Sequence, residues 1–144
     1  MSSLVLSTGG TIDKTDTLTE ETSMPADYEI DEETKTVFSR AWGKVTDEDA
    51  LNHQQRLMAD SRFNPMFNQL LDATAVVDFE ISTNGVQILA SRNPWKSGVR
   101  RAFVATDDLA FGMFRMHEAY LVENSKEIIV CKSIEEAHKW LGLD

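Results

Sequence analysis

The fold is decided by Ala102-Phe103-Val104-Ala105-Thr106, a continuous run of strand length that Asp107 and Asp108 follow. Such a run is typical of a central strand that is buried on both faces of a sheet. Asp107 or Asp108 is a favourable N-cap, and the residues after it predict a long helix through about Val122. A buried strand that leads directly into a helix indicates a β/α unit and therefore a parallel sheet.

Strand and helix patterns alternate on both sides of this unit. Residues 26–31 and 36–42 predict two strands joined by a turn, an opening β-hairpin that ends at Gly43. Five further elements are expected: a helix from an N-cap at Thr46 to about Asp60, a short strand around 69–73, a helix capped by Ser82, a strand over 127–131, and a helix capped by Ser133 with Gly142 past its end. This order predicts an α/β domain of two or three layers, with a mixed, mostly parallel sheet, an N-terminal β-hairpin and about four helices.

Composition divides the chain at residue 24. Residues 1–24 hold six Thr, four Ser and no aromatic residue. Because such a segment has little apolar surface to bury, we expect a flexible tail there. Residues 25–144 carry every Phe, Trp and Tyr of the chain and have the length of one domain of roughly 100–150 residues.

Charge and composition argue against several classes of protein. The chain has 14 basic and 24 acidic residues, a formal net charge of −10. General nucleic-acid binders have a basic surface, so we expect no nucleic-acid partner. Cys131 is the single cysteine and cannot form an internal disulfide. No apolar run approaches the ~20 residues that span a bilayer, and the first residues lack a secretory pattern. We therefore expect a cytoplasmic protein without a membrane span.

Four stretches are distinctive in their order and spacing: Gly43-Lys-Val-Thr-Asp-Glu-Asp, Asn68-Gln-Leu-Leu-Asp-Ala-Thr, Arg101-Ala-Phe-Val-Ala and Ile134-Glu-Glu-Ala-His-Lys-Trp-Leu-Gly. Together they resemble the SpoIIAA-like group of bacterial proteins, which stands beside the STAS domains of sulfate transporters and anti-sigma-factor antagonists. The resemblance covers about residues 25–143. It implies a small α/β/α domain that acts by contact with a protein partner and usually has no catalytic activity.

The resemblance also makes Ser82 and Thr83 candidate phosphorylation sites. In anti-sigma-factor antagonists an Asp-Ser-Ser-Gly motif opens the helix at the corresponding place, and a serine there is phosphorylated by the partner kinase. This chain lacks that motif, and Glu80 lies close to the candidate serine. Ser82 or Thr83 could be a phosphorylation switch, but serine is among the favoured N-cap residues, so a capping role explains Ser82 without a kinase. The N-cap is the favoured interpretation.

Residues 92–101, here called the basic segment, contain four basic residues and no acidic one: Arg92, Lys96, Arg100 and Arg101, with Trp95 among them. In an otherwise acidic domain such a segment could bind an anion or an acidic partner, with the aromatic ring as an anchor. The alternative is that these side chains pair with carboxylates of the same domain, and the frequency of surface ion pairs favours it.

The expected helix after residue 108 is apolar on more than one face. A helix that covers a sheet needs one apolar stripe. The surplus, which includes Met113, Phe114, Met116 and Tyr120, predicts a protein interface, with a homodimer as the simplest case. A wide contact with the domain's own core explains the same residues, and both interpretations stay open.

Catalytic and metal-binding patterns are weak. His53, His117 and His138 fall on three different expected helices, so no pair has metal-ligand spacing. We therefore expect no metal, no cofactor and no enzymatic activity. The alternative enzyme hypothesis would use Asp72 or Asp78, at strand ends where α/β folds place ligands.

One further likeness is short. Residues 4–13 resemble the opening loop of bacterial asparaginases, in which Thr11 would correspond to the nucleophile. The second motif of those enzymes and most of their length are missing, so we assign this stretch no activity.

These observations favour a non-enzymatic regulatory or protein-interaction domain. The alternative is a protein that binds a small lipid-like or anionic ligand, because SpoIIAA-like proteins also resemble lipid-carrier folds. A pocket between sheet and helices would support that alternative.

Overall fold

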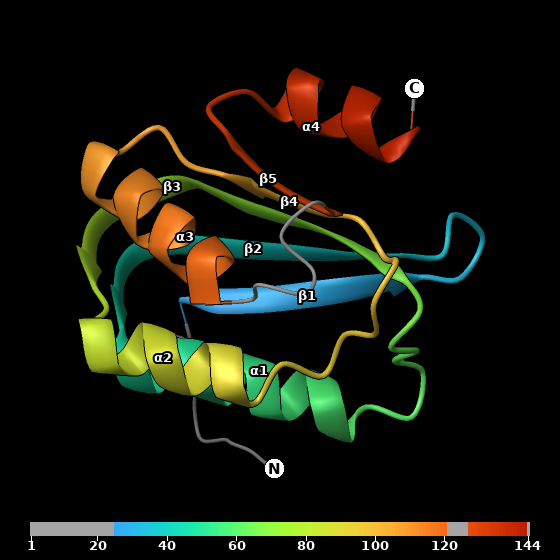
Figure 1. Ribbon diagram of the computed structural model, residues 1–144, viewed down its shortest axis with the longest axis horizontal. Coiled ribbons are helices and arrows are strands. Elements are labelled where there is room, and N and C mark those ends of the chain that lie inside the picture. The colour runs from blue at the N-terminus through green and yellow to red at the C-terminus, as the bar shows by residue number, and fades with distance from the viewer. Residues whose placement is uncertain (1–24, 121–126, 144) are drawn as a thin grey trace, which may run out of the picture.

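The five strands form one sheet whose spatial order follows the chain, β1-β2-β3-β4-β5 (Figure 1). The computed structural model describes residues 25–120 and 127–143. Its elements are β1 (Ala26–Asp31), β2 (Thr36–Thr46), α1 (Asp47–Ala59), β3 (Asn68–Glu80), α2 (Thr83–Ser91), β4 (Arg101–Val104), α3 (Asp108–Tyr120), β5 (Ile128–Cys131) and α4 (Ile134–Leu141). The expected tail, the Thr11 loop and the expected helix end at Val122 lie outside the described residues.

The sheet is mixed and mostly parallel. β1 pairs antiparallel with β2, and the pairs β2–β3, β3–β4 and β4–β5 are all parallel. Each parallel pair is joined by one helix, as crossover connections require. The predicted α/β class, with its opening hairpin and four helices, is confirmed. None of the helices in the described ranges has the length and apolar character needed to cross a membrane.

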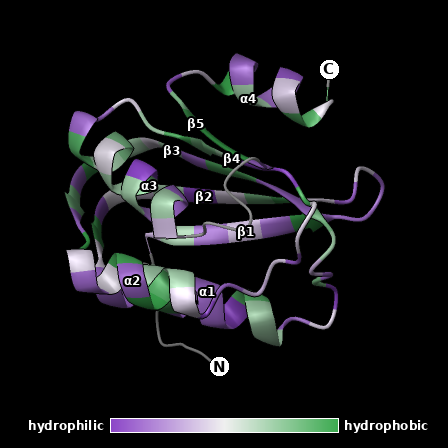
Figure 2. Cartoon of the chain, in the orientation of Figure 1, coloured by the Kyte–Doolittle hydropathy of each residue, from purple (hydrophilic) through white to green (hydrophobic). Residues whose placement is uncertain are grey.

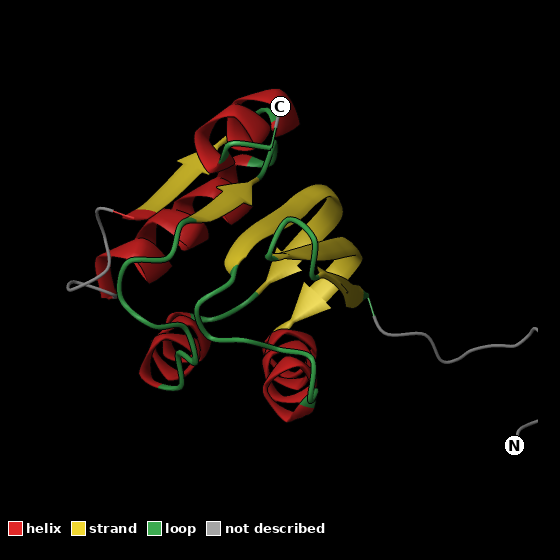
Figure 3. Ribbon diagram, turned by 90° about the vertical axis from the view of Figure 1, so that its right-hand side faces the viewer, coloured by secondary structure: helices red, strands yellow, loops and turns green. Residues whose placement is uncertain are grey.

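Alternate residues of the central strands face two separate helical layers. Leu71 and Phe103 pack with α2 and α3 residues in the larger core, whereas Leu70, Ala102 and Val104 pack against α4. Because successive side chains of a strand point to opposite faces, α1, α2 and α3 cover one face and α4 covers part of the other. In Figure 3 helices lie on both sides of the strands.

Hydropathy follows this arrangement. Figure 2 shows β5 green along its length, whereas green and purple residues mix along α2. β4 is buried at all four of its positions. Apart from Arg101, the residues of β4 and β5 are apolar, as expected of strands between two helical layers, while a helix that covers one face needs only one apolar stripe.

The expected helix caps are confirmed. Thr46 and Asp49 form a reciprocal capping box at the start of α1, in which the Thr46 backbone N–H donates to Asp49 Oδ2 at 2.9 Å. Ser133 Oγ accepts from the Glu136 N–H at 3.2 Å. The Asp107 carboxylate accepts from the Ala110 N–H at 2.9 Å, which makes Asp107 the cap of α3. Gly142 ends α4 in a left-handed conformation, as expected of a C-terminal glycine.

Two predicted strand ends are wrong. β2 does not end at Gly43 but continues to Thr46, and β3 does not end near residue 73 but continues to Glu80. The pairing of β2 with β3 shifts register twice, once between Arg40 and Trp42 and once between Gly43 and Lys44. Each irregularity breaks the period-2 alternation by which a strand is recognised in sequence. Gly43 has a φ of 65° and lies at the second shift, where β3 has one residue more than β2, and the strand continues past it.

Candidate functional site

A cavity of about 120 Å³ lies between the sheet and the layer formed by α1, α2 and α3. Most of its walls are apolar, with aromatic, aliphatic and methionine side chains from both layers. The polar side chains that line it are those of His53, Gln54, Gln69, Arg101 and His117. An apolar cavity with a few convergent polar groups is the usual form of a small-molecule site.

Arg101 is the only charged side chain among the lining residues. It opens β4, directly beside Gln69 at the start of β3, and only 7% of its surface is exposed. Two amide oxygens hold the guanidinium: Nε donates to Gln69 Oε1 at 3.0 Å, and Nη1 donates to Asn93 Oδ1 at 3.1 Å. Gln69 is itself held by Ser39, to whose Oγ its Nε2 donates at 3.1 Å. This chain of hydrogen bonds fixes the position of the cation.

Aromatic rings surround the same guanidinium. Arg101 Cζ lies 5.0 Å from the ring centroid of Trp95 and 5.1 Å from that of Phe103. Both separations are in the range of cation–π attraction. The Trp95 ring is positioned in turn by an edge contact with Phe63, at 4.9 Å between centroids.

No carboxylate balances this charge among the described residues. Their ion pairs involve Lys44, Arg56, Arg62, Arg115 and Lys132, whose side chains are all at least partly exposed. Burial lowers the pKa of Arg101 to about 9, which still leaves the guanidinium protonated at neutral pH. A buried cation without a counter-ion is unfavourable, because neutral amide and aromatic partners compensate only part of the lost hydration.

The two histidines of the cavity wall are neutral near pH 7. Burial, with a smaller contribution from nearby Arg56, lowers the pKa of His53 to about 4. Burial and then the charge of Arg101 lower the pKa of His117 to about 3. The buried His53 Nε2 has no hydrogen-bond partner among the described residues. The cavity therefore combines one positive charge with an unsatisfied polar atom and apolar walls.

The structure divides the basic segment. Trp95 and Arg101 point into the domain and are buried, whereas Arg92, Lys96 and Arg100 are exposed. Arg100 lies against Trp140, donating from Nη1 to the Trp140 carbonyl oxygen at 2.8 Å. None of the four basic residues pairs with a carboxylate within the described ranges, and only Arg101 among them lines the cavity. Anion or partner binding by the basic segment stays a prediction.

Ser82 is the N-cap of α2, as expected. Its Oγ accepts from the Gly85 N–H at 2.9 Å and donates to Asp47 Oδ2 at 2.6 Å. Thr83 is the first residue of the helix and is exposed. Phosphorylation of Ser82 or Thr83 stays a prediction.

Three of the four candidate interface residues on α3 face inward. Phe114 is buried, with its ring centroid 5.6 Å from that of Phe79 and 5.3 Å from that of Phe103. Met113 lines the cavity, and Met116 packs against the same core. Tyr120 is 43% exposed and accepts a hydrogen bond from Gln87 at 3.0 Å. Phe114 therefore belongs to the core, whereas Tyr120 and Leu109 of the same helix are exposed, and self-association stays a prediction.

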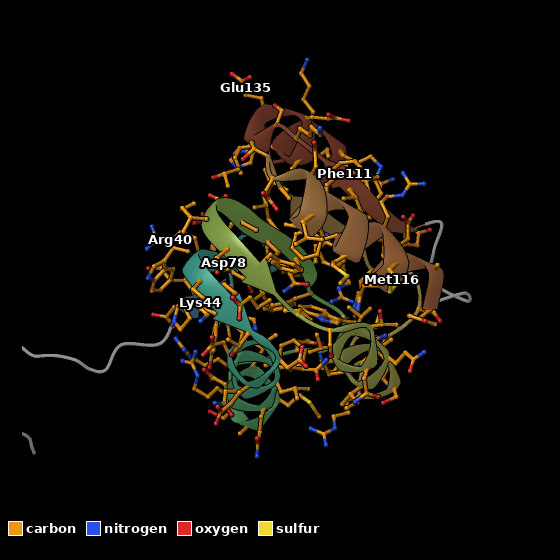
Figure 4. All side chains as sticks on the ribbon, turned by 90° about the vertical axis from the view of Figure 1, so that its left-hand side faces the viewer. Arg40, Lys44, Asp78, Phe111, Met116 and Glu135 are labelled. Atoms are coloured by element: carbon orange, nitrogen blue, oxygen red, sulfur yellow. The ribbon has the colours of Figure 1, made fainter. Side chains whose placement is uncertain are left out.

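The carboxylates of the enzyme hypothesis lie away from the cavity. Asp72 is on the opposite face of β3, where it accepts from the Thr74 N–H at 2.9 Å. Asp78 pairs in register with Lys44, and Figure 4 shows both of them with Arg40 on β2 and β3, apart from Phe111 and Met116 on α3. Asp72 also accepts from the Thr74 hydroxyl at 2.7 Å and lines, together with His138, a pocket on that opposite face. A catalytic role for Asp72 or Asp78 stays a prediction. No cluster of three or more metal-ligating side chains occurs in that part of the chain.

Four polar residues were not assigned to this site from the sequence: Gln69 and Asn93, which accept from Arg101, and His53 and His117, which line the same cavity. Gln69 carried a usable signal, because a polar residue at the start of a short buried strand needs a partner in the interior. The histidines carried none, since each is isolated on its own helix.

No protein-family model matches the chain, and no curated protein matches it. The SpoIIAA-like resemblance therefore stays a prediction that the four sequence stretches carry.

Proposed function

We propose that this domain binds a small molecule in the cavity between its sheet and the α1–α3 layer, without catalysing a reaction. The observation that carries the proposal is the coincidence of an apolar cavity with the buried, uncompensated guanidinium of Arg101. Ligand binding is the alternative function that was derived from the sequence. The residues that line the cavity now indicate which class of ligand would fit.

The cost in folding stability of this cavity and its buried polar groups supports a functional role for it. A cavity of about 120 Å³ between sheet and helices departs from the close packing of protein interiors, which has a cost in stability. The buried cation and the unpartnered His53 Nε2 add to that cost at the same position. Natural domains accept such local departures mainly where function requires them. A bound ligand would fill the space and could satisfy the polar groups.

Ligand binding in this cavity also offers a way to regulate the binding of a protein partner. Helices α1, α2 and α3 all contribute to the cavity wall, through residues such as Ala50, Leu89 and Met113. A ligand in the cavity would therefore contact the inner faces of three helices whose outer faces meet solvent. A protein partner that reads those outer faces would respond to ligand occupancy, provided that it prefers one of the two states. In this form the protein-interaction role remains part of the proposal.

The test is a ligand screen on the full chain with a blocked cavity as its control. Small fragments would be screened by thermal shift and by NMR. We expect fragments that raise Tm and shift resonances of cavity residues such as Leu71 and Met113. Ala50→Leu, which fills the cavity from α1, should abolish these effects. Ala59→Leu makes the same change at an exposed position of the same helix and should preserve them. Fragments that act equally on Ala50→Leu and the parent chain, or a screen without any binder, would refute the proposed function.

A further inference from the structure

We infer that the ligand is a small monocarboxylate of about four to six carbon atoms, whose carboxylate binds the guanidinium of Arg101 inside the cavity. This inference rests on the proposed function and specifies the chemistry of its ligand. It follows from the unused donors of Arg101, from the charge of the lining and from the size of the cavity.

The first argument concerns the donors. A guanidinium has five N–H groups. Gln69 and Asn93 occupy two of those of Arg101, on Nε and Nη1. The others, including both on Nη2, have no hydrogen-bond acceptor among the described residues. Two amides and two aromatic rings hold the cation, and its remaining donors match the two oxygens of a carboxylate.

The second argument concerns charge. Arg101 is the single charged side chain of the cavity wall, and the lining contains no Asp, Glu or Lys. One bound negative charge would balance it. A phosphate dianion would leave an excess negative charge in an apolar space, and a neutral ligand would leave the cation uncompensated. A monoanion is therefore favoured over both.

The third argument concerns size and polarity. A protein cavity of about 150 Å³ holds benzene, and this one measures about 120 Å³. A chain of about four to six carbons fits a space of that order. Its tail would contact Leu71, Phe79 and Phe114, whose side chains are apolar and favour an aliphatic or small aromatic group.

The neutral histidines fit the same ligand. His53 brings a buried Nε2 without a partner to the cavity wall. The neutral His53 imidazole already forms a hydrogen bond with the Asp27 backbone, and it adds no charge to the cavity wall. The imidazole makes the site more polar, and Arg101 alone supplies the positive charge that a ligand carboxylate would balance.

The decisive comparison uses the unmodified full chain with pentanoate and with pentanamide, its neutral analogue of nearly equal shape. Calorimetry and NMR titration would measure both Kd values. We expect pentanoate to bind about 20-fold more tightly than pentanamide, the ratio typical of a hydrogen bond to a charged group. Equal affinities for the two compounds would overturn the monocarboxylate while leaving the proposed function intact. Inorganic phosphate that binds more tightly than pentanoate would overturn it as well. Failure of every fragment and of both compounds would overturn the two proposals together.

Variants at two adjacent positions locate the carboxylate. Arg101→Met removes the cation and should reduce the pentanoate preference over pentanamide to about 2-fold or less, while pentanamide still binds. Arg100→Met is the matched control, since the Arg100 side chain is exposed and lies against Trp140. It should leave both affinities unchanged. If Arg101→Met kept the full preference, or if Arg100→Met removed it, the assignment to Arg101 would be wrong. The comparison on the unmodified chain stands even if Arg101→Met fails to fold.

Discussion

Asp47 and Ser82 join the N-termini of two helices that lie 35 residues apart in the chain. The Asp47 carboxylate accepts from the Ser82 backbone N–H at 2.7 Å and from the Ser82 hydroxyl at 2.6 Å. Ser82 Oγ in turn accepts from the Gly85 N–H. Through this link the first turn of α1 supports the cap of α2 and joins the N-termini of two neighbouring helices.

The cap makes Ser82 a stability determinant. Ser82→Ala would remove both the N-cap acceptor and the hydroxyl donor to Asp47, so we expect a loss of about 1–2 kcal/mol in the free energy of unfolding. Urea denaturation followed by circular dichroism would measure it. Thr83→Ala changes the next residue, which is exposed, and should alter stability by no more than about 0.5 kcal/mol. Equal effects of the two substitutions would show that the cap seen here carries no special energy.

A negative charge at Ser82 should be more harmful than its removal. Ser82→Glu would set a carboxylate against that of Asp47, and this repulsion would outweigh the favourable position at a helix N-terminus. We expect Ser82→Glu to be less stable than Ser82→Ala in the same denaturation series. Incubation with cell extract and ATP, followed by phosphosite mapping, tests the switch itself. Label on Ser82 together with a stable Ser82→Glu would favour the switch over the cap.

Gly85 is required by the close approach of Asp47. A Cβ at this position would collide with the Asp47 carboxylate. We expect Gly85→Ala to destabilise the domain by about 1–3 kcal/mol, although alanine is the better helix former. Gly112→Ala, at a helical glycine with open space around it, should instead stabilise by about 0.5–1 kcal/mol. Urea midpoints of the two variants compare them directly, and the same sign of change in both would contradict the collision.

Substitution of Phe114 tests whether the apolar residues of α3 serve the core or a protein interface. Truncation by Phe114→Ala removes its contacts with Phe79 and Phe103 and should cost about 3–5 kcal/mol of stability. Tyr120→Ala, at an exposed position of the same helix, should cost about 1 kcal/mol or less. Light scattering at several protein concentrations supplies the second readout. A Phe114→Ala variant that kept its stability and lost self-association would instead support the interface.

Stability should fall in weak acid because of the buried histidines. The folded-state pKa of His53 is about 4 and that of His117 is about 3, both below the ordinary value of 6.5. Between these values the unfolded chain binds more protons than the folded one, so the free energy of unfolding decreases as pH falls from about 6.5 toward 4. Urea midpoints measured from pH 7 to pH 4 would show this slope, and His53→Gln with His117→Gln should flatten it.

The Asp60 carboxyl should affect stability in a lower pH range than the two histidines, which helps to interpret that experiment. Hydrogen bonds from Arg62 and Tyr28 hold its pKa below the ordinary value of 3.8. Its contribution is therefore present at mildly acid pH and is lost only as pH falls below about 4. A slope that persisted between pH 6.5 and 4 in the double histidine variant would show that other groups cause it.

Local features were predictable because their causes lie within a few residues. Thr46, Ser82 and Ser133 each accept from a backbone N–H three positions later, so the residue and its spacing suffice to locate the helix start. The alternation of strands and helices was readable for the same reason. The ends of β2 and β3 were not, because the bulges near Trp42 and Gly43 exist only through the pairing of the two strands.

The candidate site also combines features that follow from the local sequence with features that depend on strand pairing. The sequence offered Trp95 and Arg101 as candidates for anion binding, but it did not distinguish them from Arg92, Lys96 and Arg100 of the same segment. Local sequence determined that this segment is basic and that an apolar strand follows it. Only the tertiary structure decided that Arg101 turns inward, because its direction depends on the register that sets it beside Gln69, 32 residues earlier. A one-residue slip in that register would move its side chain to the other face of the sheet, and strand pairing over such a distance cannot be read from neighbouring residues.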